Sequence, residues 1–200
     1  RVGNLMVSAT KGIEAVLDWE IAHIGDPMRD LGWVCTNSWR FGSDLPVGGV
    51  GSYEDLFAGY ESVSGRPVDR QKVKFWEVFG SFWWSVSTLG MAEHYRTGPD
   101  KSVERAAIGR RTSECQVDCV NLLIPGTVEL IEASPSESKL DMPRLEELVE
   151  SVRDYLRGDV MSGTKGRLNF LARVSGNALD IVVRELALGA QHREAERQRL

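Results

Sequence analysis

A polar stretch rich in proline and serine, at residues 133–139, divides the chain and constrains its folding more than any other feature. It reads Ala-Ser-Pro-Ser-Glu-Ser-Lys and has no apolar periodicity, which is typical of a linker. All six tryptophans lie before residue 85. We therefore expect a larger unit at residues 1–131, a linker at 132–142 and a smaller unit at 143–200.

Composition excludes several classes of protein. The chain has 200 residues, 42% of them hydrophobic and 26% charged, which fits a globular fold and argues against a disordered or fibrous chain. The net charge is −5, so a broad basic surface for nucleic acid is not expected. The sequence contains no run of about 18 apolar residues, which is the length that predicts a membrane span. The N-terminus shows no signal-peptide pattern. Three cysteines without metal-site spacing favour a reducing, cytoplasmic location.

The first unit opens with two short apolar runs, Leu5–Ser8 and Ile13–Asp18, and the turn residues Thr10-Lys11-Gly12 lie between them. This pattern predicts a β-hairpin. Asn4 directly precedes the first run, and Asp18 ends the second. The hairpin would therefore bring an amide and a carboxylate to the same end, within about 5 Å, where both can bind a hard cation.

Further acidic residues follow this pair, and their pattern allows a second interpretation. Glu20, Asp26 and Asp30 lie within the next twelve residues. Asp26 and Asp30 also suit the positions of turn and N-cap residues, which require no metal. The residues alone therefore leave open whether this segment is a metal site or a set of structural caps.

The rest of the chain predicts helices, so the fold class is mainly α (α+β). Ser52 is expected to begin one helix, which Gly65 ends, and Asp69 is expected to begin a second. The second helix places large apolar residues three and four apart, so we expect it to be mostly buried. Its apolar face comprises Phe75, Phe79, Phe82, Val86 and Leu89.

Three more helices are expected along the chain. One runs from Ser102 to Pro125, with Cys115 and Cys119 as buried hydrophobic residues of its apolar face. The other two form the second unit, one starting at Pro143 and one that Gly189 ends. Because two amphipathic helices bury little alone, they need the first unit, a second copy or both. If the chain self-associates, we expect the helices around Leu168–Leu186 to lie in the contact.

Three motifs lie near the start of the chain: Gly3-Asn4-Leu5-Met6-Val7, Val16-Leu17-Asp18-Trp19-Glu20 and Gly25-Asp26-Pro27-Met28-Arg29-Asp30-Leu31-Gly32. Two segments follow further along: Trp39-Arg40-Phe41-Gly42 and Phe75-Trp76-Glu77-Val78-Phe79-Gly80. In their order and spacing as a set, the three motifs resemble the aminoglycoside phosphotransferase-like family, whose fold is that of protein kinases. The two later segments are similar to the branch of that family associated with acyl-CoA dehydrogenases. The resemblance covers about residues 1–125, which corresponds to the C-terminal lobe only.

The resemblance assigns roles to several residues. Asn4 would bind one Mg²⁺, and Asp18 would bridge metal and the phosphates of ATP. Asp26 would brace the catalytic loop, and Glu20 would support the metal site. In the family the catalytic Asp lies five residues before the matching Asn, which is two positions before Arg1, so we expect metal ligands here without the catalytic base or the N-terminal lobe.

The same resemblance implies partners and a function. Trp76 and Trp83 are candidates for a substrate pocket, although core packing explains them as well. The expected function is part of an ATP- and Mg²⁺-dependent phosphotransferase acting on a small-molecule hydroxyl, hydroxyacyl-type rather than an aminoglycoside, and inactive as this chain alone. The alternative is a non-catalytic helical scaffold. Expected partners are a small-molecule substrate and either a second copy or an N-terminal lobe, with no nucleic acid and no membrane.

The second unit carries a resemblance of its own. The segment from Gly166 to Leu179 is similar to a small helical domain of unknown function that accompanies bacterial phosphotransferases. This resemblance covers about residues 143–189 and implies association without an activity.

Overall fold

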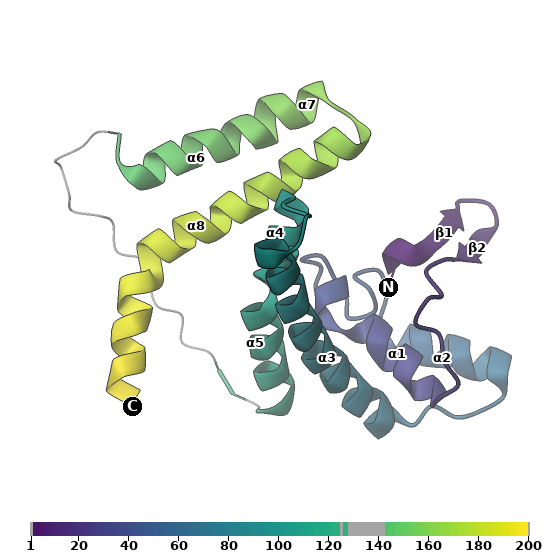
Figure 1. Cartoon of the computed structure of the whole chain (residues 1–200). Coiled ribbons are helices and arrows are strands. Elements are labelled where there is room, and N and C mark those ends of the chain that lie inside the picture. The colour runs from purple at the N-terminus through teal and green to yellow at the C-terminus, as the bar shows by residue number, and fades with distance from the viewer. Residues whose placement is uncertain (1, 125, 128–142, 200) are drawn as a thin grey trace. The chain divides into compact units, whose positions relative to one another are not determined.

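The computed structural model describes residues 2–124, 126–127 and 143–199, so the linker expected at 132–142 lies outside the described residues. The described chain is mostly helical, with one small sheet (Figure 1). No helix in these ranges combines the length and the apolar character needed to cross a membrane. Contacts divide the chain into a first unit of residues 1–88 and 111–126 and a second unit of residues 89–110 and 127–200. Residues 89–110 therefore group with the second unit, whereas the sequence placed them in the first.

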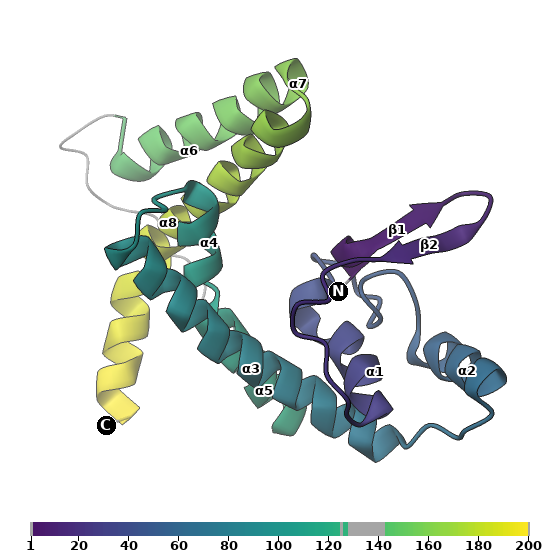
Figure 2. The same ribbon diagram turned by 45° about the vertical axis from the view of Figure 1, so that its right-hand side comes forward.

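The predicted hairpin at the start of the first unit is confirmed (Figure 2). Strands β1 (Leu5–Ser8) and β2 (Gly12–Val16) are antiparallel, with Leu5 opposite Val16 and Ser8 opposite Gly12. Gly12 has a φ of 74°, a left-handed conformation that glycine adopts without steric cost. The turn residues thus set the register, which places the start of β1 at Leu5 opposite the end of β2 at Val16.

The first unit also contains α1 (Pro27–Cys35), α2 (Tyr53–Ser64), α5 (Thr112–Leu123) and most of α3 (Arg70–Thr97). The predicted limits of α2 are confirmed. The Ser52 hydroxyl accepts the N–H of Asp55 at 3.1 Å, and Gly65 caps the other end with a φ of 65°.

The hydrophobic core of the first unit lies where α1, α2 and α3 meet. Met28, Leu31, Phe57 and Val73 form a buried cluster. The backbones of α1 and α3 approach closely at Gly32, where a Cβ would stand 2.6 Å from the Cβ of Trp76. Only glycine permits this contact, so this residue fixes the packing of the two helices.

A carboxylate lies inside this packed region. Glu77 of α3 is only 1% exposed, and its Oε1 accepts hydrogen bonds from Arg40 Nη2 at 3.0 Å and from the Tyr53 hydroxyl at 2.9 Å. Burial, together with the neighbouring Glu77 charge, raises the pKa of Tyr53. The group links three segments of the chain, because Arg40 follows α1 and also donates to the carbonyl of Cys35 at 2.9 Å.

The expectation that the apolar face of α3 is mostly buried is wrong. Phe75 and Phe82 are 59% and 58% exposed, and Val86 and Leu89 are also more than half exposed. The buried side of α3 is instead its narrow, largely polar face, which packs close to α1 and α5. Small residues on that side allow close approach, and the bulky residues are left outside. The buried residues of α3 are Val73, Glu77, Gly80, Ser81, Ser85 and Thr88.

The second unit is helical and contains α4 (Val103–Gly109), α6 (Leu145–Tyr155), α7 (Met161–Gly163) and α8 (Gly166–Arg199). One π-helical turn, Leu156–Val160, joins α6 to α7. The two long helices α6 and α8 form a hairpin, in which Asp180 of α8 binds Arg153 and Arg157 from α6 and the turn that follows it. Ion pairs also join α4, and the residue that caps it, to α8; they are Glu104–Arg167 at 2.6 Å and Arg110–Glu185 at 2.5 Å.

Two predicted helix limits in this part of the chain are wrong. The helix expected from Ser102 to Pro125 is divided into α4 and α5, because Gly109 packs against Ala92 and Thr112 binds Thr88 within different units. The helix expected to end at Gly189 continues to Arg199. A single glycine costs a helix only about 1 kcal/mol, and the good helix formers that follow it sustain the helix.

Replacing Glu77 tests how far the first unit depends on its buried carboxylate. We expect Glu77→Ala to lower the free energy of unfolding by about 3–5 kcal/mol, because Arg40 is left as an unpaired, mostly buried charge. The matched control is Glu54→Ala, which removes an exposed contact between Glu54 and Arg70 at 3.9 Å and is expected to cost at most about 1 kcal/mol. Urea unfolding of both variants, followed by tryptophan fluorescence, measures the difference, and equal losses would contradict the prediction.

Candidate functional site

Asn4 and Asp18 meet at the open end of the hairpin. Asn4 closes the one-turn helix Val2–Asn4, and its carbonyl accepts the N–H of Leu17 at 2.8 Å, which extends the strand pairing by one residue. Asp18 comes next, and the Asn4 Nδ2 donates to its Oδ2 at 2.6 Å. The expected proximity of these two side chains is confirmed.

The backbone at Asp18 adopts an uncommon conformation. Its φ is 69°, in the left-handed region, where Asp is tolerated better than most residues that carry a side chain. The following Trp19 turns back, and its Nε1 donates to the carbonyl of Val16 at 2.6 Å. This turn holds the Asp18 carboxylate beside Asn4, and strain of this kind gathers at functional sites.

The amide of Asn4 and the carboxylate of Asp18 suit a hard cation that keeps part of its hydration shell. Asn4 is half-buried and Asp18 is exposed, so both are accessible to a ligand from solution. Nowhere in the described chain do three His, Cys, Asp or Glu side chains gather as a metal cage. A pair of amide and carboxylate groups fits Mg²⁺, which proteins bind through one or two carboxylates while phosphates and water complete the octahedron.

Asp26 lies at the start of α1 and has a structural position. Its Oδ1 accepts the N–H of Met28 at 3.0 Å as the N-cap of the helix, and its Oδ2 accepts Trp76 Nε1 at 3.3 Å. The hydrogen bond from Met28, followed by that from Trp76, lowers the pKa of Asp26. The capping interpretation is confirmed, and through Trp76 the carboxylate also ties the start of α1 to α3.

Glu20 lies in an exposed turn just after the site. The turn is closed by the N–H of Ala22, which donates to the carbonyl of Trp19 at 3.0 Å. This position is two residues beyond Asp18, on the segment that leads away from the hairpin. Its supporting role stays a prediction.

The two candidate pocket residues, Trp76 and Trp83, lie on α3 and contact other aromatic rings. Trp76 is half-buried and meets Phe79 edge-on at 5.4 Å. Trp83 meets Trp33 of α1 edge-on at 5.4 Å. These contacts are what core packing requires. A substrate pocket at these residues stays a prediction.

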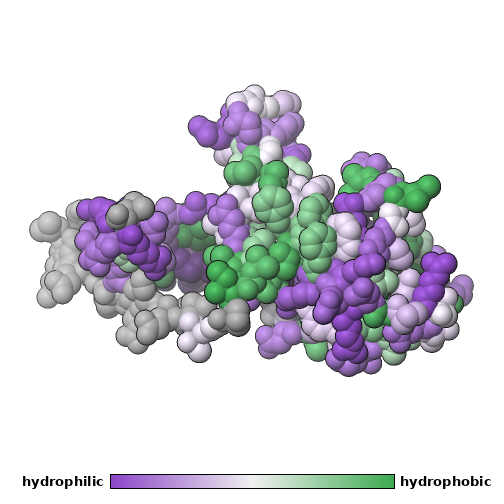
Figure 3. Space-filling view, turned by 90° about the horizontal axis from the view of Figure 1, so that it is seen from below, coloured by the Kyte–Doolittle hydropathy of each residue, from purple (hydrophilic) through white to green (hydrophobic). Residues whose placement is uncertain are grey.

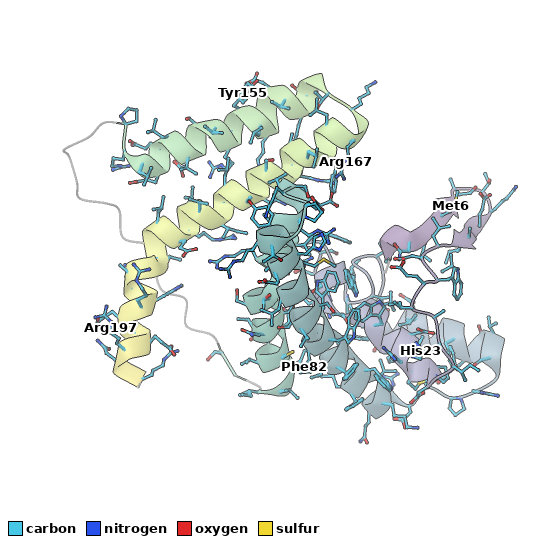
Figure 4. All side chains as sticks on the ribbon, viewed as in Figure 1. Met6, His23, Phe82, Tyr155, Arg167 and Arg197 are labelled. Atoms are coloured by element: carbon cyan, nitrogen blue, oxygen red, sulfur yellow. The ribbon has the colours of Figure 1, made fainter. Side chains whose placement is uncertain are left out.

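No pattern in the sequence predicted the contacts made by Arg29. Its guanidinium lies 5.5 Å from the ring centre of Trp76 and binds the ring nitrogen of His23, on the segment between Asp18 and α1. Figure 4 labels His23 in this region. The segment that follows the hairpin is thus held to α3 by Asp26 and Arg29.

The comparison with family models bears on both ends of the chain. Residues 1–76 match the phosphotransferase enzyme family. This match contains Asn4, Asp18, Glu20 and Asp26, and it ends at Trp76. Residues 162–200 match a domain of unknown function, DUF6285, over a range that contains α8. Searches of the curated proteins and of the solved structures found no match to the chain.

Substitution of Asp26 tests its position as a cap. We expect Asp26→Ala to lower the melting temperature at pH 7, because α1 loses its N-cap and Trp76 loses its acceptor. Trp76→Phe leaves the N-cap of α1 intact and keeps an aromatic ring beside Arg29, while it removes the hydrogen bond to Asp26 and part of the ring, and it should lower the melting temperature less.

The effect of Asp26→Ala should also depend on pH. A lowered pKa means that the ionised carboxylate stabilises the fold above its usual value of 3.8, and that this contribution is lost as the pH falls through the folded-state pKa. The difference in melting temperature between the native chain and Asp26→Ala should therefore narrow below about pH 4. Thermal unfolding at a series of pH values measures it, and a constant difference would contradict the assignment.

Proposed function

We propose that the first unit forms the Mg²⁺-binding part of an ATP-dependent phosphotransferase. The observation that carries the proposal is the contact between Asn4 and Asp18 inside the segment that matches the phosphotransferase family. An amide and a carboxylate at one point, on a backbone held in a left-handed turn, are suited to an ion that bridges protein and phosphate oxygens. We place this unit as the C-terminal lobe of a kinase-like fold.

Each residue of the site has a separate task in this proposal. A bound Mg²⁺ would neutralise charge on the phosphoryl group in transfer. Asp18 supplies a carboxylate to it and Asn4 supplies an amide oxygen, while Asn4 also orients Asp18 through their hydrogen bond. Asp26 and Arg29 hold the following segment against α3, so that Asp18 keeps its place. Glu20, two residues beyond Asp18, would add negative charge to the segment that carries the site.

The substrate we propose is a small molecule with a hydroxyl group, of the hydroxyacyl type. Its support is the similarity of Trp39–Gly42 and Phe75–Gly80 to the branch associated with acyl-CoA dehydrogenases. Aminoglycosides carry several amines and call for an acidic pocket, whereas Trp76 and Trp83 present aromatic surface. In the family resemblance, the carboxylate that would deprotonate the hydroxyl is the catalytic Asp, and none of the 200 residues corresponds to it.

A second candidate function has its own observation. The outer face of α6 carries Leu145, Leu148, Val152 and Tyr155, each at least 50% exposed and spaced three and four residues apart. Tyr155 points away from α8 (Figure 4). Such a stripe suits a partner helix, which favours a role for the second unit as a binding module.

Binding of Mn²⁺, used as a probe for Mg²⁺, tests the metal site. Electron paramagnetic resonance measures the free ion in the presence of ATP, with the native chain or a variant added. We expect Asp18→Asn and Asn4→Ala each to raise the dissociation constant at least about tenfold, because each removes one of two protein ligands. Asp44→Asn is the control, since it removes an exposed charge elsewhere in the unit. Binding that Asp18→Asn leaves unchanged would contradict the proposal.

A separate assay tests the need for a base. We expect a polypeptide of these 200 residues, with Mg-ATP and a panel of hydroxyacyl compounds, to transfer no phosphate above background. The reason is that, in the family resemblance, none of the residues that the structure describes corresponds to the carboxylate that accepts the proton of the attacking hydroxyl. Transfer at a rate typical of kinases would contradict this expectation.

A further inference from the structure

An exposed apolar face lies on α3 and α5 within the first unit. Its members project from two neighbouring helices, and each is more than half exposed; we call it the α3–α5 face. It comprises Phe75, Phe82 and Val86 of α3 with Val120 and Leu123 of α5.

The two helices run side by side along this face. Thr88 of α3 shares a hydrogen bond of 2.9 Å with Thr112 of α5, and further along the Cys119 thiol lies 3.9 Å from the carbonyl of Val78. These contacts make the pair antiparallel. On α3 the members of the face are seven and four residues apart, and on α5 they are three apart. With these spacings they line one side of the helix pair. Figure 3 shows hydrophobic residues gathered over these helices, and Figure 4 labels Phe82 where α3 passes α5.

The face lacks the charges that normally keep a helix surface in water. From residue 75 to 89 the only charged side chain is Glu77, and from 116 to 124 it is Asp118. Both are buried on other sides of their helices, where they bind Arg40 and Asn37 respectively. Depletion of charged residues over an apolar centre is the compositional mark of a protein interface.

The size of the face matches what a stable dimer needs. With about 150–200 Å² for each large side chain, its five residues expose roughly 500 Å² of apolar surface at their measured exposures. A standard interface buries about 800 Å² on each partner, of which somewhat more than half is apolar. One copy of this face opposite another therefore supplies the apolar centre of an interface of ordinary size.

We propose that the α3–α5 face binds a second copy of the chain. The interface is isologous, with the same patch on both sides, so α3 and α5 of one copy pack on α3 and α5 of its partner in a four-helix layer. The aromatic rings of Phe75 and Phe82 are the central anchors. The face is separate from the Asn4–Asp18 pair, so this inference does not depend on the proposed phosphotransfer.

Sedimentation of the full chain at about 1–50 µM tests the proposal. We expect a dimer for the native chain, and at least about a tenfold weaker association for Phe82→Glu and for Leu123→Glu, which bury a charge at the contact. Val63→Glu is the control, because Val63 of α2 is 89% exposed and lies outside the face. Circular dichroism verifies that each variant keeps its helices. If the charged variants lose their helices, the milder Phe82→Ala should still weaken the dimer.

Three outcomes would overturn the proposal. One is a native chain that stays monomeric over the whole range of concentration. Another is a dimer that Phe82→Glu and Leu123→Glu do not weaken. The third is a dimer that Leu168→Glu or Tyr155→Glu dissociates while Phe82→Glu does not, because that result would place the contact on the hairpin of α6 and α8.

Discussion

The buried Glu77 carboxylate is the interaction on which the first unit depends. Its oxygen holds Arg40 and Tyr53 together, and these residues come from three separate segments of the chain. Such a pair contributes little net stability, because both charges lose their hydration when they are buried. It does impose geometry, since any packing that separates α3 from Arg40 leaves a charge unpaired in the interior. Burial also raises the pKa of the neighbouring Cys35 thiol to about 12, which keeps that group uncharged beside the carboxylate.

The candidate metal site stands outside this core and relies on it indirectly. The hairpin is largely exposed, and the pairing of its strands, together with the turn at Trp19, aligns Asn4 with Asp18. The segment between the hairpin and α1 connects the site to the core of the unit. Asp26 and Arg29 attach this segment to Trp76 of α3. Trp76 in turn packs next to the core cluster. The candidate site is thus placed by a series of contacts from the core outward, while the side chains of Asn4 and Asp18 stay accessible to solvent.

Local features of this chain could be predicted from the sequence, and features that depend on distant partners could not. The hairpin, the cap at Ser52, the turn at Gly65 and the nearness of Asn4 and Asp18 all follow from residues close together in the chain. Periodicity correctly placed the phenylalanines of α3 on one side, but it says only which residues share a face. Whether the face is covered depends on what packs against it. The glycines and serines of α3 let α1 and α5 occupy its other sides instead.

Glu77, the acidic residue within Phe75–Gly80, indicates in the sequence that a buried charge pair exists. A charged residue that is buried on a helix requires a partner, and here the partners are Arg40 and Tyr53, 37 and 24 residues away. No local spacing connects them, so the pairing could not be predicted. The division of the expected third helix into α4 and α5 has the same origin, because it is the packing of Gly109 on Ala92 that separates them.

The second unit shows why a matched segment and a folding unit need not coincide. The match to DUF6285 begins at residue 162, so it contains α8 and leaves out α6 and α4. A helix of 34 residues with charges around much of its surface is not stable merely by its length, since most helical stability comes from packing an apolar side. Here α6 covers one side of α8, where Gly176 leaves room for the Arg157 side chain on its way to Asp180, and α4 packs on another. The helix that contains most of the matched segment therefore folds as part of a unit in which α4 and α6 lie outside the match.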